Sequence, residues 1–181
     1  MKRFLLAAAV LLALGSGPAA AQAVNPDATI NVIGAALTIA VNAQDLTFPD
    51  VTLDGTDQSV IGTASPTFTL TDATGTGNGW NVTVQSADFD DGGGNVIPAS
   101  GFTYTAQLGN IVTVAGNAPP TETGNAGSLD VGFQSLTAAV NEGMGSYTWQ
   151  PNAAQFGLVV PAETVAGTYT AMMTVTIASG P

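Results

Sequence analysis

The sequence contains no cysteine and no histidine, and its only basic residues are Lys2 and Arg3. Without cysteine, neither disulfides nor thiolate metal sites are available. Beyond Arg3 the chain therefore has no histidine-dependent triad, no thiol nucleophile and no lysine for a Schiff base. Two carboxylates can still hydrolyse a glycoside. The acidic residues, however, lie in turn-like segments where a raised pKa is not expected. We predict that the protein is not an enzyme.

The two basic residues begin a segment with the features of a secretory signal peptide. They precede an apolar run over residues 4–14, which is shorter than the about 20 residues that span a bilayer. Small residues follow and end in Ala21-Gln22-Ala23. We predict a signal peptide over residues 1–23, cleaved after Ala23, with Ala21 as the alternative. Residues 24–181 then form the secreted domain, which has no membrane insertion of its own.

Removal of the signal peptide leaves a chain without any positive side chain. Its formal charge changes from −11 to −13, because both basic residues are lost and all 13 acidic residues remain. No side-chain salt bridge can form, so each carboxylate must be solvated, accept hydrogen bonds or bind an external cation. Binding of nucleic acid and electrostatic attraction to anionic lipid are excluded, since both need basic side chains.

Alternating apolar and polar residues predict an all-β fold. We expect a single antiparallel β-sandwich of nine to eleven strands over residues 24–181. Segments 67–71 and 80–85 should form one hairpin, and 102–106 and 111–114 another. Residues 117–132 read as a long loop, and 136–141 as either a helical turn or a strand. The other predicted strands are 30–41, 46–53, 145–149, 156–160 and 168–177.

Three segments of the chain carry a likeness to a known family. They are Leu46-Thr47-Phe48 with Val51-Thr52-Leu53-Asp54-Gly55, Thr71-Asp72…Gly75-Thr76-Gly77…Gly79-Trp80, and Val160-Pro161-Ala162…Ala166-Gly167-Thr168-Tyr169-Thr170-Ala171. In these segments the chain resembles the WxL-domain family of secreted bacterial proteins. The resemblance implies a β-rich surface domain that associates non-covalently with the cell wall, through peptidoglycan, often beside other surface proteins. The family pattern of tryptophan, any residue and leucine occurs twice. Here it reads Trp80-Asn81-Val82 and Val175-Thr176-Ile177, so the second tryptophan is missing.

Three aromatic residues are candidates for a sugar-binding platform. Tyr147 and Trp149 are two residues apart and share one face of a strand, and Trp80 begins another. Tyrosine and tryptophan offer a large apolar face with a polar group at one edge. The alternative is that all three belong to the core of the sandwich, as large aromatic residues often do.

The loop that follows the Trp80 strand is a candidate Ca²⁺ site. Asp88, Asp90, Asp91 and Asn95 supply oxygen ligands on a Gly-rich loop, and no basic side chain is present to neutralise them. The spacing does not fit an EF-hand, because Gly92 stands where the third ligand belongs. A solvated acidic turn is the alternative.

Together these features predict a secreted, non-catalytic protein that adheres to cell-wall peptidoglycan. The alternative is a structural subunit of a surface layer or filament. In that case the apolar segment 30–41 would pair with the sheet edge of a neighbouring copy, because no lysine protects that segment.

Overall fold

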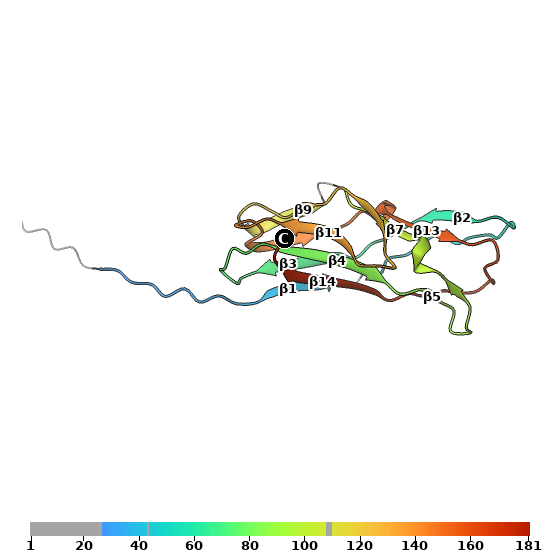
Figure 1. Ribbon diagram of the computed structural model, residues 1–181, viewed down its shortest axis with the longest axis horizontal. Helices are drawn as coiled ribbons and strands as arrows, with labels where there is room; N and C mark the ends of the chain where they lie inside the picture. Colours follow the sequence, from blue (N-terminus) through green and yellow to red (C-terminus); the bar gives the residue numbers. More distant parts are fainter. Residues whose placement is uncertain (1–26, 43, 108–109) are drawn as a thin grey trace, which may run out of the picture. The chain divides into compact units, whose positions relative to one another are not determined.

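The computed structural model describes residues 27–42, 44–107 and 110–181 (Figure 1). The chain divides after Val32, and every strand belongs to the unit Ile33–Pro181. The described residues of the preceding unit, Asp27–Val32, form neither helix nor strand. The predicted signal peptide and its cleavage at Ala23 lie outside the described residues. Within the described ranges, no helix has the length and hydropathy that crossing a bilayer requires.

The regular secondary structure of the unit Ile33–Pro181 consists almost entirely of antiparallel strands, which confirms the predicted all-β sandwich. The described residues of this unit form fourteen strands, more than expected, because several contain only two or three residues. They are β1 (Leu37–Asn42), β2 (Gln58–Ile61), β3 (Thr67–Asp72), β4 (Trp80–Ser86), β5 (Phe89–Asp90), β6 (Val96–Ile97), β7 (Phe102–Thr105), β8 (Ile111–Gly116), β9 (Thr121–Glu122), β10 (Ala126–Ser128), β11 (Phe133–Ala138), β12 (Gly145–Trp149), β13 (Phe156–Val160) and β14 (Met173–Ser179), with short 3₁₀ helices η1 (Ala99–Gly101) and η2 (Ala153–Gln155).

Three four-stranded sheets and one two-stranded ribbon make up this unit. The sheet orders are β1-β3-β12-β8, β14-β4-β11-β9 and β10-β7-β13-β2, and β5 pairs with β6. The edge strands β1 and β14 of the first two sheets contact each other. Figure 1 shows these two sheets at one end of the unit and the sheet of β13 and β2 at the other.

Both predicted hairpins are wrong. β3 pairs with β1 and β12, whereas β4 pairs with β11 and β14, so the Gly-rich segment 73–79 crosses between two sheets. Likewise, β7 pairs with β10 and β13, while β8 pairs with β12. Alternation indicates that one face of a strand is buried, but it does not identify the neighbour with which the strand pairs.

Several predicted boundaries also differ from the structure. The strand expected over 30–41 begins at Leu37, and the strand expected over 168–177 begins at Met173. Segment 46–53 forms only an isolated bridge between Thr47 and Ala64. Residues 133–138 are strand β11, and the predicted loop over 117–132 contains β9 and β10. The prolines and glycines in these stretches limit strand length without preventing short ladders.

The core is filled by residues that alternate along the central strands. In β4, Trp80, Val82 and Val84 are buried, and in β3 the buried residues are Phe68 and Leu70. Each such side chain contributes about 2 kcal/mol through the apolar surface that it removes from water. The alternation that predicted these strands is therefore also the pattern that builds the core.

One carboxylate, Glu122 of β9, lies inside the aromatic core. It is 2% exposed, and its Oε1 accepts hydrogen bonds from Tyr104 Oη at 3.0 Å and Trp149 Nε1 at 3.1 Å. Asn110 Nδ2 lies 3.4 Å from the same oxygen, while Oε2 is buried without a partner. Burial and the charge of Glu122 raise the pKa of Tyr104 above its ordinary value. Sequence reasoning did not single out Glu122, because an acid between Thr121 and Thr123 resembles any solvated acid.

Candidate functional site

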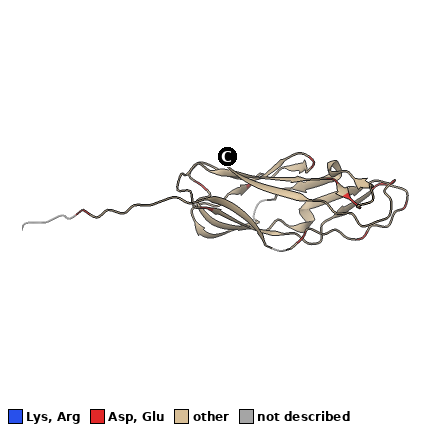
Figure 2. Cartoon of the chain, turned by 90° about the horizontal axis from the view of Figure 1, so that it is seen from below, with Lys and Arg blue, Asp and Glu red and all other residues tan. Residues whose placement is uncertain are grey.

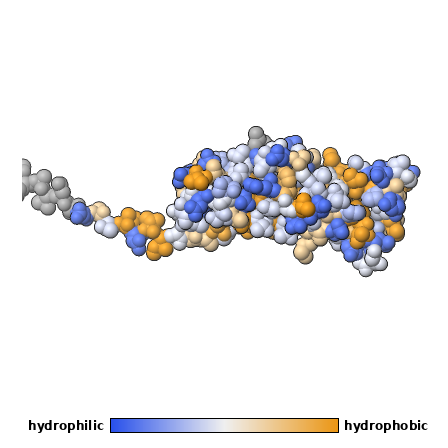
Figure 3. Space-filling view, viewed as in Figure 1, coloured by the Kyte–Doolittle hydropathy of each residue, from blue (hydrophilic) through white to orange (hydrophobic). Residues whose placement is uncertain are grey.

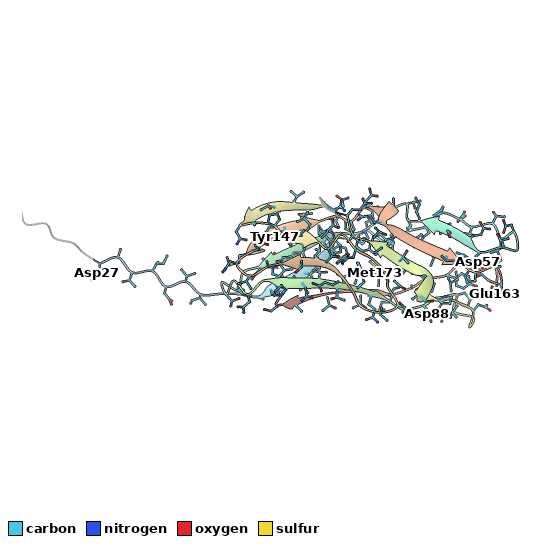
Figure 4. The ribbon with its side chains drawn as sticks, turned by 45° about the horizontal axis from the view of Figure 1, so that its top comes forward. Asp27, Asp57, Asp88, Tyr147, Glu163 and Met173 are labelled. Carbon is cyan, nitrogen blue, oxygen red and sulfur yellow. The ribbon has the colours of Figure 1, made fainter. Side chains whose placement is uncertain are left out.

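A long groove of about 1340 Å³ opens between two loop segments that are distant in sequence, residues 44–53 and 164–171. Its walls continue onto β1 and β14, through Val41 and Met173 among others. Figure 4 labels Met173 in the β unit, with Asp57, Asp88 and Glu163 lying toward the end opposite Tyr147. The lining of the groove combines apolar and polar side chains, and we take it as the candidate site.

Aromatic rings form part of the groove lining. Phe48 makes edge-to-face contacts with Phe89 and Phe102, with ring centroids 6.2 and 5.8 Å apart. Phe89 and Phe102 are themselves 5.2 Å apart at an interplanar angle of 70°. Because Phe48 and Phe89 are only partly buried, the groove offers apolar ring surface to a ligand.

The first wall, residues 44–53, is held to the unit by backbone hydrogen bonds of Thr47. Thr47 N donates to Ala64 O at 3.1 Å, and Thr63 N donates back to Thr47 O at 2.8 Å. The hydroxyls of Thr47 and Thr63 lie 3.1 Å apart. Pro49, with no N–H to contribute to a ladder, follows this bridge. The segment is therefore anchored at one point and lies along the groove instead of joining a sheet.

The second wall, residues 164–171, is held by β5. Thr170 and Asp90 exchange two backbone hydrogen bonds, at 2.9 and 3.0 Å. Tyr169 Oη donates to Val165 O at 2.7 Å, which closes the segment on itself. Partial burial, and then the charge of Asp91, raise the pKa of Tyr169 above its ordinary value. Tyr169 is therefore a neutral hydroxyl in the groove at neutral pH.

The acidic loop predicted to bind Ca²⁺ lies beside this second wall. Asp91 Oδ1 accepts from Gly93 N at 2.7 Å and from Asn95 N at 3.0 Å, and its Oδ2 accepts from Asn95 Nδ2 at 2.6 Å. Asp90 Oδ1 accepts from Gly92 N, and Asp88 Oδ1 from Ala99 N. The loop thus supplies its carboxylates with neutral donors, one of the three possibilities that the sequence left open.

These hydrogen bonds have an electrostatic consequence. The bonds from Asn95 and Gly93 lower the pKa of Asp91 below its usual 3.8, because they stabilise the ionised form. Within the part of the chain that the structure describes, no group of three or more acidic side chains is placed to hold a metal ion. The Ca²⁺ site at Asp88, Asp90, Asp91 and Asn95 remains a prediction.

The predicted aromatic platform requires a correction. Trp80 and Tyr147 are 0% exposed and Trp149 is 1% exposed. Trp80 Nε1 donates to Gly143 O at 2.9 Å, and Trp149 stacks on Phe68 with centroids 4.9 Å apart. Such buried rings offer no face to a sugar, so these residues form the core, as the alternative interpretation held. Large aromatic residues at alternating positions fit a core and a platform equally well, and only burial separates the two.

The two tripeptides that match the family pattern lie on neighbouring strands. In the β4–β14 ladder, Val82 is opposite Ile177 and Val84 is opposite Val175. Trp80 and Val82 are buried, whereas Val175 is half-buried and lines the groove. The position that lacks the second tryptophan therefore faces the groove.

Two of the three segments that carry the family likeness line the groove. Residues 46–48 and 51–53 form its first wall, and residues 166–171 form its second. The third segment, Thr71–Trp80, lies at the other end of β3 and β4 and does not contribute to the lining. Both groove segments are visible in the sequence as parts of the family likeness, but the sequence carries no signal that they line one opening.

Figure 2 shows the acidic residues mainly on the loops, as the sequence predicts.

The chain was compared with known protein families, curated proteins and solved structures. A family model described as WxL domain, surface cell wall-binding, matches residues 18–181. Neither the curated proteins nor the solved structures contain a significant match to the chain.

Proposed function

Because the chain belongs to the WxL family of surface cell-wall-binding domains, we propose that it is secreted and attaches non-covalently to peptidoglycan through the groove, without catalysing a reaction. One observation carries this proposal. Two segments of family likeness that are distant in sequence contribute to the lining of one opening, through residues 46–53 and 164–171.

The chemistry of the lining suits a glycan. Sugar rings have apolar faces that pack on aromatic surface, and Phe48 and Tyr169 supply such surface. Their hydroxyls need hydrogen-bonding partners, and the rim supplies carboxylates and threonine hydroxyls. The polar lining residues of this kind are Asp45, Asp50, Thr47, Thr52, Thr164, Thr168 and Thr170.

The acids of the groove support binding over catalysis. Asp45 and Asp50 are both exposed. A glycosidase needs one carboxyl group that keeps its proton in an apolar environment beside a second that stays ionised. Two solvated carboxylates do not provide that difference. The groove therefore supports retention of a ligand at the wall and not hydrolysis.

A pull-down with purified peptidoglycan tests this proposal. The wild-type protein should be retained, and Tyr169→Ala should weaken retention because it removes the aromatic surface of the second wall. Met172→Ala is the matched control, since Met172 is 77% exposed, close in sequence and not part of the lining. Equal retention of both variants, with unchanged melting temperatures, would show that the groove is not the wall-binding site.

A second candidate function is assembly with other copies at the surface. It is favoured by one observation, the exposure of Ile30, Val32 and Ile33 at 82–85%. Apolar side chains gathered in this way mark interaction sites. Attachment to the wall and assembly are compatible, since they would use different parts of the chain.

A further inference from the structure

Large apolar side chains are exposed to solvent in two short stretches of the molecule. The N-terminal arm, defined as Asp27–Ile33, exposes Ile30 at 85%, and Val32 and Ile33 at 82% each. Strand β8 exposes Val112 at 63% and Val114 at 65%. Nowhere else among the described residues do two large apolar side chains, each more than 60% exposed, occur within three consecutive positions. Figure 3 shows hydrophobic residues on the arm.

β8 has the properties of an acceptor edge. It is the last strand of the sheet β1-β3-β12-β8 and pairs only with β12. Ile111 packs against the core, and all the other residues of the strand are exposed. Lysine, the common protection of edge strands, is absent, and one bulge at Val114 limits the regular stretch to Ile111–Thr113. An added strand can therefore pair over this stretch and cover Val112.

The arm has the properties of the added strand. It contains no proline, and Ile30 and Val32 are two residues apart, so in an extended conformation they would share one face. Side chains that lie opposite one another on neighbouring strands are in contact, and such cross-strand pairs stabilise a sheet. Asp27 is the single charged residue in either stretch. Pairing therefore brings together the least charged parts of an acidic chain.

We propose that the N-terminal arm of one copy adds as a strand to the free edge of β8 in a second copy. The arm continues into β1, and β1 and β8 are the opposite edges of one sheet. The donor and the acceptor are different segments of the chain, so the contact joins unlike surfaces and is head-to-tail. Repetition of such a contact gives an open polymer unless the rotation closes a ring. This inference deepens the assembly function and is independent of wall binding.

Cysteine crosslinking tests the contact, because the chain has no cysteine of its own. A Val32→Cys protein is mixed with a Val112→Cys protein under mild oxidation, and disulfide-linked dimers are separated on a non-reducing gel. The yield of this mixed dimer should exceed the yield from a mixture of Val32→Cys with Val140→Cys. Val140 is a control position that is 60% exposed. Equal yields would overturn the proposal. So would preferential formation of an intrachain disulfide in a chain that carries both Val32→Cys and Val112→Cys.

Light scattering supplies a second, independent measurement. The unmodified secreted protein should show masses at multiples of the monomer, more so at high salt, because salt screens the repulsion between acidic chains. Ile30→Asp with Val32→Asp should abolish them, whereas Thr29→Asp with Asn31→Asp adds the same charge and should not. A strict monomer at all concentrations, or equal loss in both double variants, would overturn the proposal. Retention on peptidoglycan should be the same for both, which separates this outcome from failure of wall binding.

Discussion

The two tripeptides that match the family pattern lie side by side on β4 and β14, yet they serve different regions. Trp80-Asn81-Val82 belongs to the core, with Trp80 fully buried and bonded to Gly143. Val175-Thr176-Ile177 borders the groove, where Val175 is only half-buried. Similar tripeptides therefore have different roles: the one on β4 packs in the core, and the one on β14 lies beside the groove. Four changes test this contrast.

Replacement of Trp80 and of Val175, the first residues of the two tripeptides, should give the largest difference in unfolding free energy. Trp80→Ala should cost about 3–5 kcal/mol of unfolding free energy, because it empties a core position. Val175→Ala removes two partly buried methyl groups and should cost about 1 kcal/mol. Urea denaturation followed by circular dichroism measures both. Similar losses would contradict the division into core and groove residues.

The buried and exposed acids offer a second comparison. Glu122→Ala leaves the donors of Tyr104 and Trp149 without their shared acceptor, and each unsatisfied donor costs about 1–3 kcal/mol. Asn110 Nδ2 keeps Gln155 Oε1 as an acceptor at 2.8 Å. We expect a loss of about 3 kcal/mol in total, since small rearrangements recover part of it. Glu163→Ala, at an exposed position of the groove end, should change stability by less than about 0.5 kcal/mol. Thermal and urea unfolding measure both losses of stability. A loss for Glu163→Ala as large as that for Glu122→Ala would contradict the prediction.

Two glycines with similar backbone angles separate strain from packing. Gly143 has φ 69° and Gly92 has φ 74°, so alanine at either position costs about 1–2 kcal/mol of backbone strain. At Gly143 an added Cβ would lie 2.5 Å from Ala138 Cβ and 2.7 Å from Trp80 Nε1, whereas at Gly92 nothing lies within 4 Å. Gly143→Ala should therefore be worse than Gly92→Ala by about 1–3 kcal/mol. Equal midpoints in urea would show that Trp80 is less tightly packed than described.

Acid pH should loosen the loops that carry Asp54 and Asp91 before it affects the core. Hydrogen bonds lower the pKa values of Asp54 and Asp91 below 3.8. Their stabilising contribution is therefore present above 3.8, the value for an unperturbed aspartate, and is lost as the pH falls through the lower folded values. In an NMR titration from about pH 5 to 2, the amides of Thr56 and Gly93 should shift before the Trp80 indole N–H. If the indole responds first, the core is the acid-sensitive region.

The buried strands were predictable because their alternation is a local property. Residues 67–72, 80–86, 145–149 and 156–160 follow period two, and all four segments are strands. Which strands pair is a property of the whole chain, so the sequence misplaced the partners of β3, β4, β7 and β8. Short ladders such as β9 and β10 depend on neighbouring strands and have too few residues for a periodic signal.

The candidate site was only partly predictable for the same reason. Segments 46–53 and 160–171 were recognised from the family likeness, but their meeting across a groove requires the tertiary fold. The aromatic residues could be assigned to a platform or to the core, because a tryptophan in an alternating strand indicates a buried face as readily as a binding face. Glu122 carried no signal at all, since its burial depends on Tyr104 and Trp149 from other strands.

The most direct test of the groove as the wall-binding site is to map where a ligand touches the protein. Soluble peptidoglycan fragments are titrated into the isotope-labelled secreted protein, and the amide shifts are followed by NMR. The shifts should concentrate on residues 46–53 and 164–171, with β14 near Val175, and should leave the Gly143 turn and β8 unchanged. Shifts confined to the Trp80 end, or to β8, would contradict the assignment of wall binding to the groove.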